Sequence, residues 1–158
     1  MFSGKLLSIH VSPAAGQHMQ TVSQALAVPG RGLQGDRYFD GQGKYSDRHG
    51  PDREVTLIEI ESIQALSQEA RIDLSPGDAR RNLVTGGVPL NHLVGKDFQI
   101  GAVRLHGVRL CEPCDYLAKL TQPGILPALV HRGGLRAQIL SEGVLHSGDT
   151  ITLSQETP

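Results

Sequence analysis

Both cysteines of the chain lie in one four-residue stretch, Cys111-Glu112-Pro113-Cys114, which follows a β-like run. Two thiols at this spacing can form a redox pair, share a soft metal, or leave one sulfur as an activated thiolate while the other packs. Cys114 is the better candidate for chemistry, because a helical turn is expected just after it and a helix N-terminus lowers the pKa of a thiol. Cys111 still belongs to the strand, where it can point inward as a small apolar side chain.

Other uses of the two thiols have less support. A zinc knuckle needs four ligands, and the chain has no second cysteine pair. A dithiol redox motif needs a thioredoxin-like strand–helix–strand setting, which the order of elements does not offer. The plainest alternative, in which both thiols are inert packing residues, stays open because buried free cysteine is common.

Cationic side chains form the second candidate group, and each lies beside a turn that contains glycine. Backbone N–H groups and guanidinium forks at such turns can jointly hold a phosphate or a polar heterocycle. The candidates are Arg37 after Gly35-Asp36, Arg80-Arg81-Asn82 after Gly77-Asp78, and His131-Arg132 before Gly133-Gly134.

Each of these arginines has an ordinary alternative, in which it is solvated or paired with a nearby carboxylate. In an extended chain Arg80 and Arg81 face opposite ways, so only one of them is expected to reach a given ligand. Asp36 and Asp78 are expected to brace turns. His131 is the histidine expected nearest to the second cysteine, and the other histidines show no mutual metal-ligand spacing.

Length and charge limit the class of protein. The 158 residues are expected to form a single domain, residues 1–158, with a core large enough to fold without disulfides. A formal net charge of −1 and no long run of like charge argue against nucleic-acid or membrane partners. The N-terminal residues lack a signal-peptide pattern and no segment approaches about 18 uninterrupted apolar residues, so we expect a cytoplasmic protein.

The elements that must position these residues are short and are separated by glycine and proline turns. Apolar side chains at helical spacing predict a helix at residues 59–71, and residues 115–130 are expected to be helical in parts, interrupted at residues 122–124 and near Pro127. A long irregular loop is predicted at residues 30–52, bearing Arg37, Arg48, His49 and Arg53. Strands are predicted at residues 5–11, 21–28, 54–58, 81–85, 96–100, 102–110, 135–140 and 150–153.

This pattern of elements favours a mainly β fold. About eight strands without strand–helix alternation are typical of a closed or partly closed antiparallel β-barrel, here with one or two short helices. Closure would also remove the exposed edges of many short strands. A β-sandwich is the main alternative.

Taken in order, the glycine-bearing turns, the strands and the cysteine pair resemble the MOSC domain, named after the C-terminal domain of molybdenum cofactor sulfurases. The resemblance runs from about residue 32 to residue 151, and the series of motifs is more specific than any one of them. Its parts are Gly32-Leu-Gln-Gly-Asp-Arg-Tyr38, Arg53-Glu-Val-Thr-Leu-Ile58, Pro76-Gly-Asp-Ala-Arg-Arg-Asn82, Val94-Gly-Lys-Asp-Phe-Gln-Ile-Gly101, Cys111-Glu-Pro-Cys114, Arg132-Gly-Gly-Leu135 and Gly148-Asp149.

The resemblance implies a barrel-like fold and an association with the molybdenum cofactor (molybdopterin), a pterin that carries a dithiolene and a phosphate. It implies that Cys114 is the molybdenum ligand or, in a sulfurase setting, the carrier of sulfur. Pyridoxal phosphate is a second ligand that the resemblance suggests. Arginine-bearing turns suit the phosphate and ring edge of the pterin, and the cofactor-binding residues we expect are Arg37, Arg80, Arg81, Asn82, His131, Arg132 and Gly133.

Two positions depart from the family pattern. Members often have His where this chain has Tyr38, and Glu where this chain has Arg81 between Arg80 and Asn82. Replacing Glu by Arg turns a negative charge into a positive one and changes what a pocket there can accept. We expect a standalone, near-minimal member of bacterial type, without the extra β-barrel domain of the larger reductases.

Three functions follow as hypotheses. In the first, Cys114 binds molybdenum and the protein reduces N-hydroxylated or related N-oxygenated small molecules with electrons from a separate redox partner. In the second, Cys114 receives sulfur as a persulfide from a cysteine desulfurase and passes it to a metal centre, with Arg132 or His131 stabilising the thiolate. In the third, the protein carries the cofactor without turnover.

Overall fold

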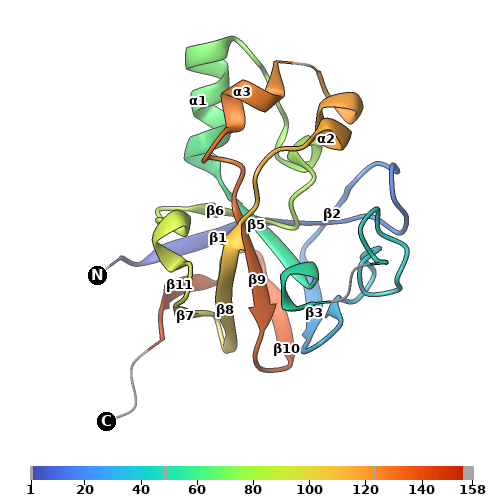
Figure 1. Cartoon of the computed structure of the whole chain (residues 1–158). Coiled ribbons are helices and arrows are strands. Elements are labelled where there is room, and N and C mark those ends of the chain that lie inside the picture. Colours follow the sequence, from blue (N-terminus) through green and yellow to red (C-terminus); the bar gives the residue numbers. More distant parts are fainter. Residues whose placement is uncertain (1, 48–49, 123, 155–158) are drawn as a thin grey trace.

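Short strands dominate the part of the chain that the computed structural model describes, residues 2–47, 50–122 and 124–154 (Figure 1). The helices are α1 (Ile60–Ala70), α2 (Asp115–Leu120) and α3 (Ile125–Leu129), and 3-10 turns lie at Pro51–Arg53, Pro76–Ala79 and Leu90–Leu93. The strands are β1 (Gly4–Val11), β2 (Gln20–Val22), β3 (Gln24–Val28), β4 (Gly32–Leu33), β5 (Val55–Glu59), β6 (Leu83–Gly86), β7 (Asp97–Ile100), β8 (Val103–Leu110), β9 (Leu135–Ile139), β10 (Gly143–His146) and β11 (Thr150–Leu153).

Seven of the strands form a closed barrel, in the order β11-β7-β8-β9-β5-β6-β1. Antiparallel pairing of β1 with β11 closes it. Every neighbouring pair is antiparallel except β5 and β6, which run parallel and are joined through α1, since a parallel pair needs a crossover. β2 extends the sheet beyond β1, and β10, β3 and β4 form a second sheet. The predicted mainly β barrel is confirmed, and the sandwich alternative is wrong.

Alternate residues of the strands fill the barrel, because successive side chains of a strand point to opposite faces. In β9, Leu135, Ala137 and Ile139 are buried, while the residues between them are only partly buried. Phe98 of β7 and Leu105 of β8 are fully buried in the same core. The polar residues of β9, Arg136 and Gln138, are therefore directed outward, where they can line a site on the barrel wall.

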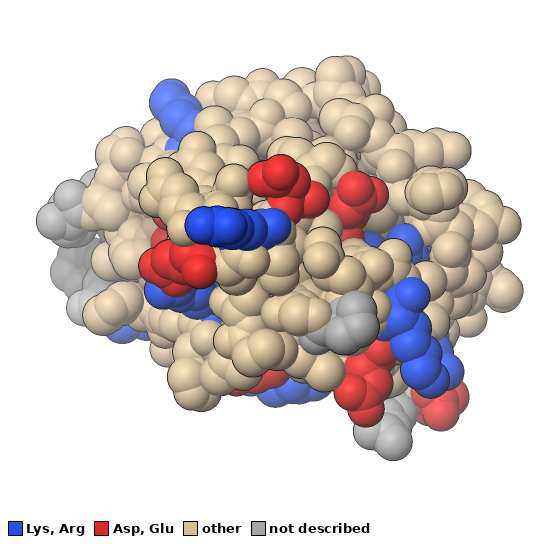
Figure 2. Space-filling model, turned by 90° about the horizontal axis from the view of Figure 1, so that it is seen from above, with Lys and Arg blue, Asp and Glu red and all other residues tan. Residues whose placement is uncertain are grey.

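The three helices cover one end of the barrel (Figure 1). Seen from that end, basic and acidic side chains are scattered, with no large area of one sign (Figure 2). None of the described helices is long and apolar enough to cross a membrane. A second apolar core lies between the helices and the barrel, formed by Ile58, Ile63, Leu66, Ile72, Ala79, Val84, Leu117, Ile125 and Leu129.

Five details of the predicted elements were wrong. The predicted irregular loop at residues 30–52 contains the short strand β4. Residues 21–28 form two strands that join different sheets, and residues 143–146 form a strand that was not predicted. Residues 81–82 precede β6 and are not part of it. Pro127 lies within α3 and does not interrupt it, because the first turn of a helix leaves its N–H groups free. Arg48 and His49, two of the four cations assigned to the predicted loop, lie outside the described residues.

Candidate functional site

A cavity of about 320 Å³ lies where the end of β8, the start of β9 and α2 meet, and we call it the thiol cavity. Cys114 lies in its wall, together with aromatic side chains from the loop after β4 and from α2. Six of the lining residues are arginines, brought together from distant parts of the chain: Arg37, Arg53, Arg80, Arg81, Arg109 and Arg136.

Cys114 lies immediately before the first residue of α2, and its side chain is half-buried. Tyr45, from the loop after β4, donates its hydroxyl hydrogen to the Cys114 Sγ atom at 3.4 Å. The two residues are 69 positions apart, so only the folded chain brings them together. A thiol in this position is both accessible and hydrogen-bonded.

The surroundings of Cys114 favour its thiolate form. Burial raises the pKa of the thiol, but the hydrogen bond from Tyr45, the backbone N–H groups of Leu117 and Tyr116, and the charge of Arg81 together bring the pKa below its ordinary value. The same hydrogen bond, aided by burial, raises the pKa of Tyr45 to about 12. The phenol therefore keeps its proton and remains a donor to the sulfur.

Arg81 fixes the segment that carries the thiol. Its Nε atom donates to the carbonyl of Gly133 at 2.8 Å, and its Nη2 atom donates to the carbonyl of Cys111 at 3.1 Å. These bonds tie the turn before β6 to the cysteine stretch and to the turn before β9. Arg81 thus contributes a nearby positive charge to Cys114 while its donors are used by the backbone.

Arg80 and Arg81 both line the thiol cavity, which corrects the expectation that only one of them would. The reason is that Arg80 is not extended: its φ of 60° is left-handed and it ends the 3-10 turn at Pro76–Ala79. Its Nη1 atom donates to the carbonyl of Gln17 at 2.6 Å. Burial and the nearby Arg37 guanidinium lower the pKa of Arg80, as expected for a cation short of acceptors.

Arg37 and Asp36 form a buried ion pair at 3.0 Å on another wall of the cavity. Asp36 also accepts from the backbone N–H groups of Ser12 at 3.1 Å and Tyr38 at 3.4 Å. Asp36 therefore braces a turn, as predicted, and fixes Arg37 at the cavity. Asp78 also braces its turn, since its Oδ2 atom accepts from Ser75 Oγ at 2.7 Å.

Arg109 and Arg136 lie directly opposite each other on β8 and β9. Like charges at paired positions of a sheet are destabilising unless an anion lies between them. The Asp52 carboxylate supplies negative charge there, since Arg109 Nε donates to its Oδ2 atom at 2.9 Å. Arg136 Nη1 donates to the main-chain carbonyl of Asp52 at 3.2 Å. Burial raises the pKa of Asp52, but the hydrogen bond from Arg109 and the charge of Arg53 bring it below its ordinary value.

Three of the arginines that line the thiol cavity each have one buried guanidinium nitrogen without a hydrogen-bond partner among the described residues. They are Nε of Arg53, Nη2 of Arg80 and Nε of Arg136. A buried donor without an acceptor costs about 1–3 kcal/mol, and more when it is charged. The cavity is therefore suited to an anionic ligand that accepts hydrogen bonds from several arginines at once.

Asn82 and Gly133 act through the framework of the site and do not line the cavity. The Asn82 Oδ1 atom accepts from the Thr56 N–H at 3.1 Å, and its Nδ2 atom donates to the His10 carbonyl at 3.1 Å. Gly133 offers its carbonyl to Arg81, and a side chain there would meet the Cys111 carbonyl. Both residues position strand ends.

His131 and Arg132 lie outside the thiol cavity, on exposed surface. The His131 Nδ1 atom pairs with Glu112 Oε2 at 3.1 Å, and Arg132 Nη1 pairs with Glu69 Oε2 at 2.7 Å. Neither residue lines the thiol cavity, but His131 contacts Glu112, which does. His131 has a left-handed φ of 62°.

Tyr45, Tyr116, Arg109 and Arg136 line the cavity and were not among the predicted site residues. The two arginines occupy ordinary strand positions, so only knowledge of the β8–β9 register could have identified them. Among the described residues, no group of three or more His, Cys, Asp or Glu side chains could hold a metal ion. Cys114 is the more exposed of two cysteines that line the cavity beside a set of cations.

The sequence of this chain matches the family model described as the MOSC domain over residues 44–152. The chain belongs to the MOSC domain family. The matched region includes the cysteine stretch, the turn with Arg80 and Arg81, and β9. The resemblance inferred from the sequence motifs is therefore confirmed.

Solved structures share the fold of this MOSC domain. The YuaD protein from Bacillus subtilis has a TM-score of 0.79 at 14% identity, covering 96% of this chain and 97% of that one. YiiM from Geobacillus stearothermophilus has a TM-score of 0.72 at 16% identity, covering 96% of this chain and 75% of that one. YiiM from Escherichia coli has a TM-score of 0.67 at 17% identity, covering 99% and 71%. No curated protein sequence matches this chain.

Proposed function

We propose that this MOSC protein binds the molybdenum cofactor in the thiol cavity and reduces N-hydroxylated or related N-oxygenated compounds, with Cys114 as the molybdenum ligand. The observation that carries the proposal is that one cavity joins an activated thiol to three buried guanidinium nitrogens without partners among the described residues. A thiolate suits a soft metal that dithiolene sulfur already holds, and guanidinium groups suit a phosphate.

The residues present fit the cofactor by their donor chemistry. Arg53, Arg80 and Arg136 would donate to its phosphate and to the polar edge of the pterin, and Cys114 would bind the metal. When bound, the cofactor supplies a metal centre that exchanges an oxygen atom and an electron pair with a substrate. Pyridoxal phosphate would find the same phosphate donors, but the described residues that line the cavity include no lysine to form its usual imine.

The chain's own residues would orient the reacting groups and hold protons. Tyr45 keeps a proton next to the Cys114 sulfur, and Arg81 holds the cysteine stretch in place. Reduction of an N-hydroxyl compound to the amine takes up an electron pair and a pair of protons and releases water. The electrons would come from a separate redox partner, and the substrate would be a small molecule. His131 and Arg132 have no part in this proposal.

Metal and pterin analysis tests the cofactor assignment. Protein purified from a host that makes the cofactor should contain molybdenum and pterin in amounts close to that of the protein. The double variant Arg80→Met, Arg136→Met should lose both, whereas Arg104→Met, an exposed arginine of β8 outside the cavity, should keep both. Wild-type protein that is free of molybdenum and pterin would overturn the assignment.

Turnover tests the reaction. Cofactor-loaded, chemically reduced protein should convert an N-hydroxylated base into the amine, and Cys114→Ser should abolish this while Cys111→Ser has a milder effect. Equal losses in the two cysteine variants would contradict the ranking of the thiols. Loaded protein without any such turnover would instead support the carrier hypothesis.

Sulfur transfer is the second candidate function, favoured by the lowered pKa of the accessible Cys114 thiol. The Cys114 thiolate would attack the outer sulfur of a cysteine desulfurase persulfide, take that sulfur, and release the desulfurase thiolate. Mass spectrometry after incubation with a desulfurase and cysteine should then show one added sulfur atom on Cys114. Finding none, in protein without molybdenum, would reject this function.

A further inference from the structure

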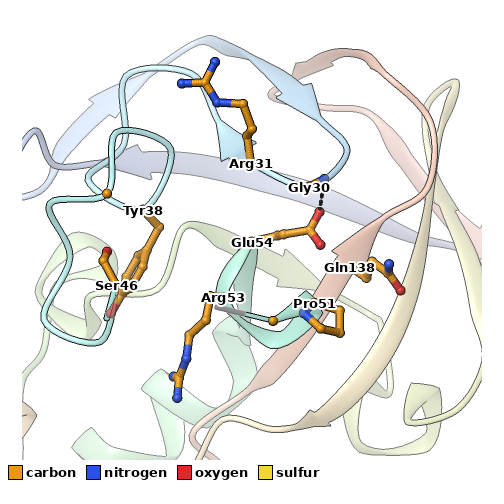
Figure 3. Close-up of a pocket in the computed structure, with 10 residues that line it drawn as sticks. Gly30, Arg31, Tyr38, Ser46, Pro51, Arg53, Glu54 and Gln138 are labelled. Atoms are coloured by element: carbon orange, nitrogen blue, oxygen red, sulfur yellow. Dashed lines mark hydrogen bonds between the residues drawn. The ribbon is translucent and has the colours of Figure 1, made fainter. Parts of the chain in front are cut away.

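A second cavity, of about 340 Å³, shares Tyr38 and Arg53 with the thiol cavity. It lies between the loop after β4, the 3-10 turn at Pro51–Arg53, and β9. Figure 3 shows Glu54 at its centre, between Tyr38 on one side and Gln138 on the other. We call it the Glu54 cavity.

The carboxyl group of Glu54 is held by hydrogen bonds to one of its oxygens, and its other oxygen is available to a ligand. Glu54 is only 5% exposed. The Oε1 atom accepts from the backbone N–H groups of Gly30 at 3.0 Å and Ile139 at 3.2 Å. The Oε2 atom has no hydrogen-bond partner within the described part of the chain. Two backbone donors therefore fix a buried carboxyl whose second oxygen is left for a ligand.

The arginines around the Glu54 cavity do not neutralise Glu54. Figure 3 shows the guanidinium groups of Arg31 and Arg53 leading away from the carboxyl group in opposite directions. Arg31 lies 3.8 Å from the centre of the Phe39 ring and donates to the Phe39 carbonyl, and Arg53 lies 5.2 Å from the centre of the Tyr45 ring. Burial raises the pKa of Glu54, and the carboxyl group has no paired cation among the residues that the structure describes.

The other walls of the Glu54 cavity carry neutral polar groups and one aromatic ring. Gln138 and Ser46 offer side-chain oxygens, and Tyr38 offers an aromatic ring. A primary ammonium group has three N–H donors, which match a carboxylate oxygen and neighbouring neutral acceptors. An aromatic ring attracts a nearby cation and packs against a hydrocarbon chain. The lining thus combines a charged anchor, polar acceptors and one apolar wall.

We propose that the Glu54 cavity is a binding site for a small primary ammonium compound, an alkyl- or arylalkylamine, whose charged head pairs with Glu54. The proposal does not depend on which ligand the thiol cavity takes. Because Tyr38 and Arg53 line both cavities, an amine in this site would contact the wall of the thiol cavity.

Titration calorimetry with benzylamine tests the proposal. Wild-type protein should bind benzylamine saturably, and the neutral analogue benzyl alcohol should bind far more weakly. Glu54→Gln keeps an oxygen for the Gly30 and Ile139 N–H groups but removes the charge, so affinity should fall about tenfold or more. Cys114→Ser should bind like the wild type, which separates this site from the proposed function. Equal affinity in Glu54→Gln, equal binding of benzyl alcohol, or no saturable binding would each overturn the proposal.

Amide chemical shifts of the wild-type protein give a readout that needs no variant. Addition of benzylamine should shift the resonances of Gly30, Glu54 and Ile139, and leave those of residues 115–120 in place. Shifts concentrated at residues 115–120 would place the amine in the thiol cavity and overturn the assignment to the Glu54 cavity, even if Glu54→Gln failed to fold.

Discussion

Cys111 and Cys114 differ in what surrounds their sulfur atoms, although they are close neighbours in the sequence. Cys111 is 1% exposed, and its backbone is bonded to Arg81 and to Gly134. Both residues line the thiol cavity, but Cys114 is half-buried and accepts a hydrogen bond from Tyr45. One thiol therefore belongs to the framework of the site, and the other is available to a ligand.

Removing the Tyr45 hydroxyl should raise the pKa of the Cys114 thiol. In Tyr45→Phe the thiolate loses a hydrogen bond that stabilises it, so a higher pH is needed to ionise the sulfur. The pH dependence of the alkylation rate by iodoacetamide measures this in cofactor-free protein. Tyr116→Phe is the matched control, because the contribution of Tyr116 comes from its backbone N–H. An unchanged alkylation profile in Tyr45→Phe would contradict the assigned role.

Replacing Arg81 should destabilise the fold. Arg81→Met leaves the carbonyls of Cys111 and Gly133 without donors, which we expect to cost about 2–3 kcal/mol in the free energy of unfolding. Arg81→Glu, which restores the residue often found in the family, should cost more because a carboxylate would face the same carbonyls. Urea unfolding measures both, with the exposed Arg104→Met expected to change stability by about 0.5 kcal/mol or less. Wild-type stability in Arg81→Glu would refute this role.

At the scale of elements, the backbone of the turn before β9 passes close to the backbone of two other segments. A side chain at Gly133 would meet the Cys111 carbonyl, and one at Gly134 would meet the Leu57 carbonyl. Gly134 also has a φ of 114°, a conformation that favours glycine. The two glycines therefore let β9 start between β5 and β8, and this placement brings Arg136 to the thiol cavity.

Substituting Gly134 should disrupt the close approach of this turn to Leu57. Gly134→Ala combines backbone strain with a clash against Leu57, so we expect a loss of about 3 kcal/mol or more in the free energy of unfolding. Gly35, with a φ of 93° and open space around it, isolates the strain alone, and Gly35→Ala should cost about 1–2 kcal/mol. Denaturant unfolding compares the two variants. Equal losses would show that close packing at Gly134 does not matter.

At the scale of the whole molecule, the barrel is closed by a short contact. β1 and β11 pair through Gly4 with Ile151 and Lys5 with Thr150. The same β11 strand pairs with β7 on its other side, so it joins the two ends of the barrel sheet. Ile151 is fully buried in the barrel core, whereas Leu153 is only partly buried.

Truncating Ile151 should therefore weaken the whole fold. Ile151→Ala removes buried apolar atoms at the closure and should cost about 2–5 kcal/mol. Leu153→Ala, on the same strand, should cost clearly less because part of its surface already faces water. Thermal unfolding followed by circular dichroism checks this order, and a greater loss in Leu153→Ala would contradict the proposed role of the closure.

Much of the fold could be predicted from local patterns, but the contacts of the site could not. Alternating apolar residues and glycine turns were enough to predict most strands and α1, because strand and helix periods depend on nearby residues. The split of residues 20–28 between two sheets and the parallel β5–β6 pair depend on distant partners, so they were not predicted. His131, the histidine expected nearest to the thiol, does not line the thiol cavity but pairs with Glu112, which does.

The sequence by itself determined the MOSC family and the mainly β barrel, because motifs and periodicity are local properties of the chain. The choice of Cys114 over Cys111 as the candidate thiol stays a prediction. The tertiary structure alone decided which side chains surround that thiol. Tyr45, Arg109 and Arg136 reach the cavity through loop packing and strand register, whereas Arg132 lies outside it and pairs with Glu69. Distances between such residues depend on how separate elements pack, and no spacing in the sequence encodes them.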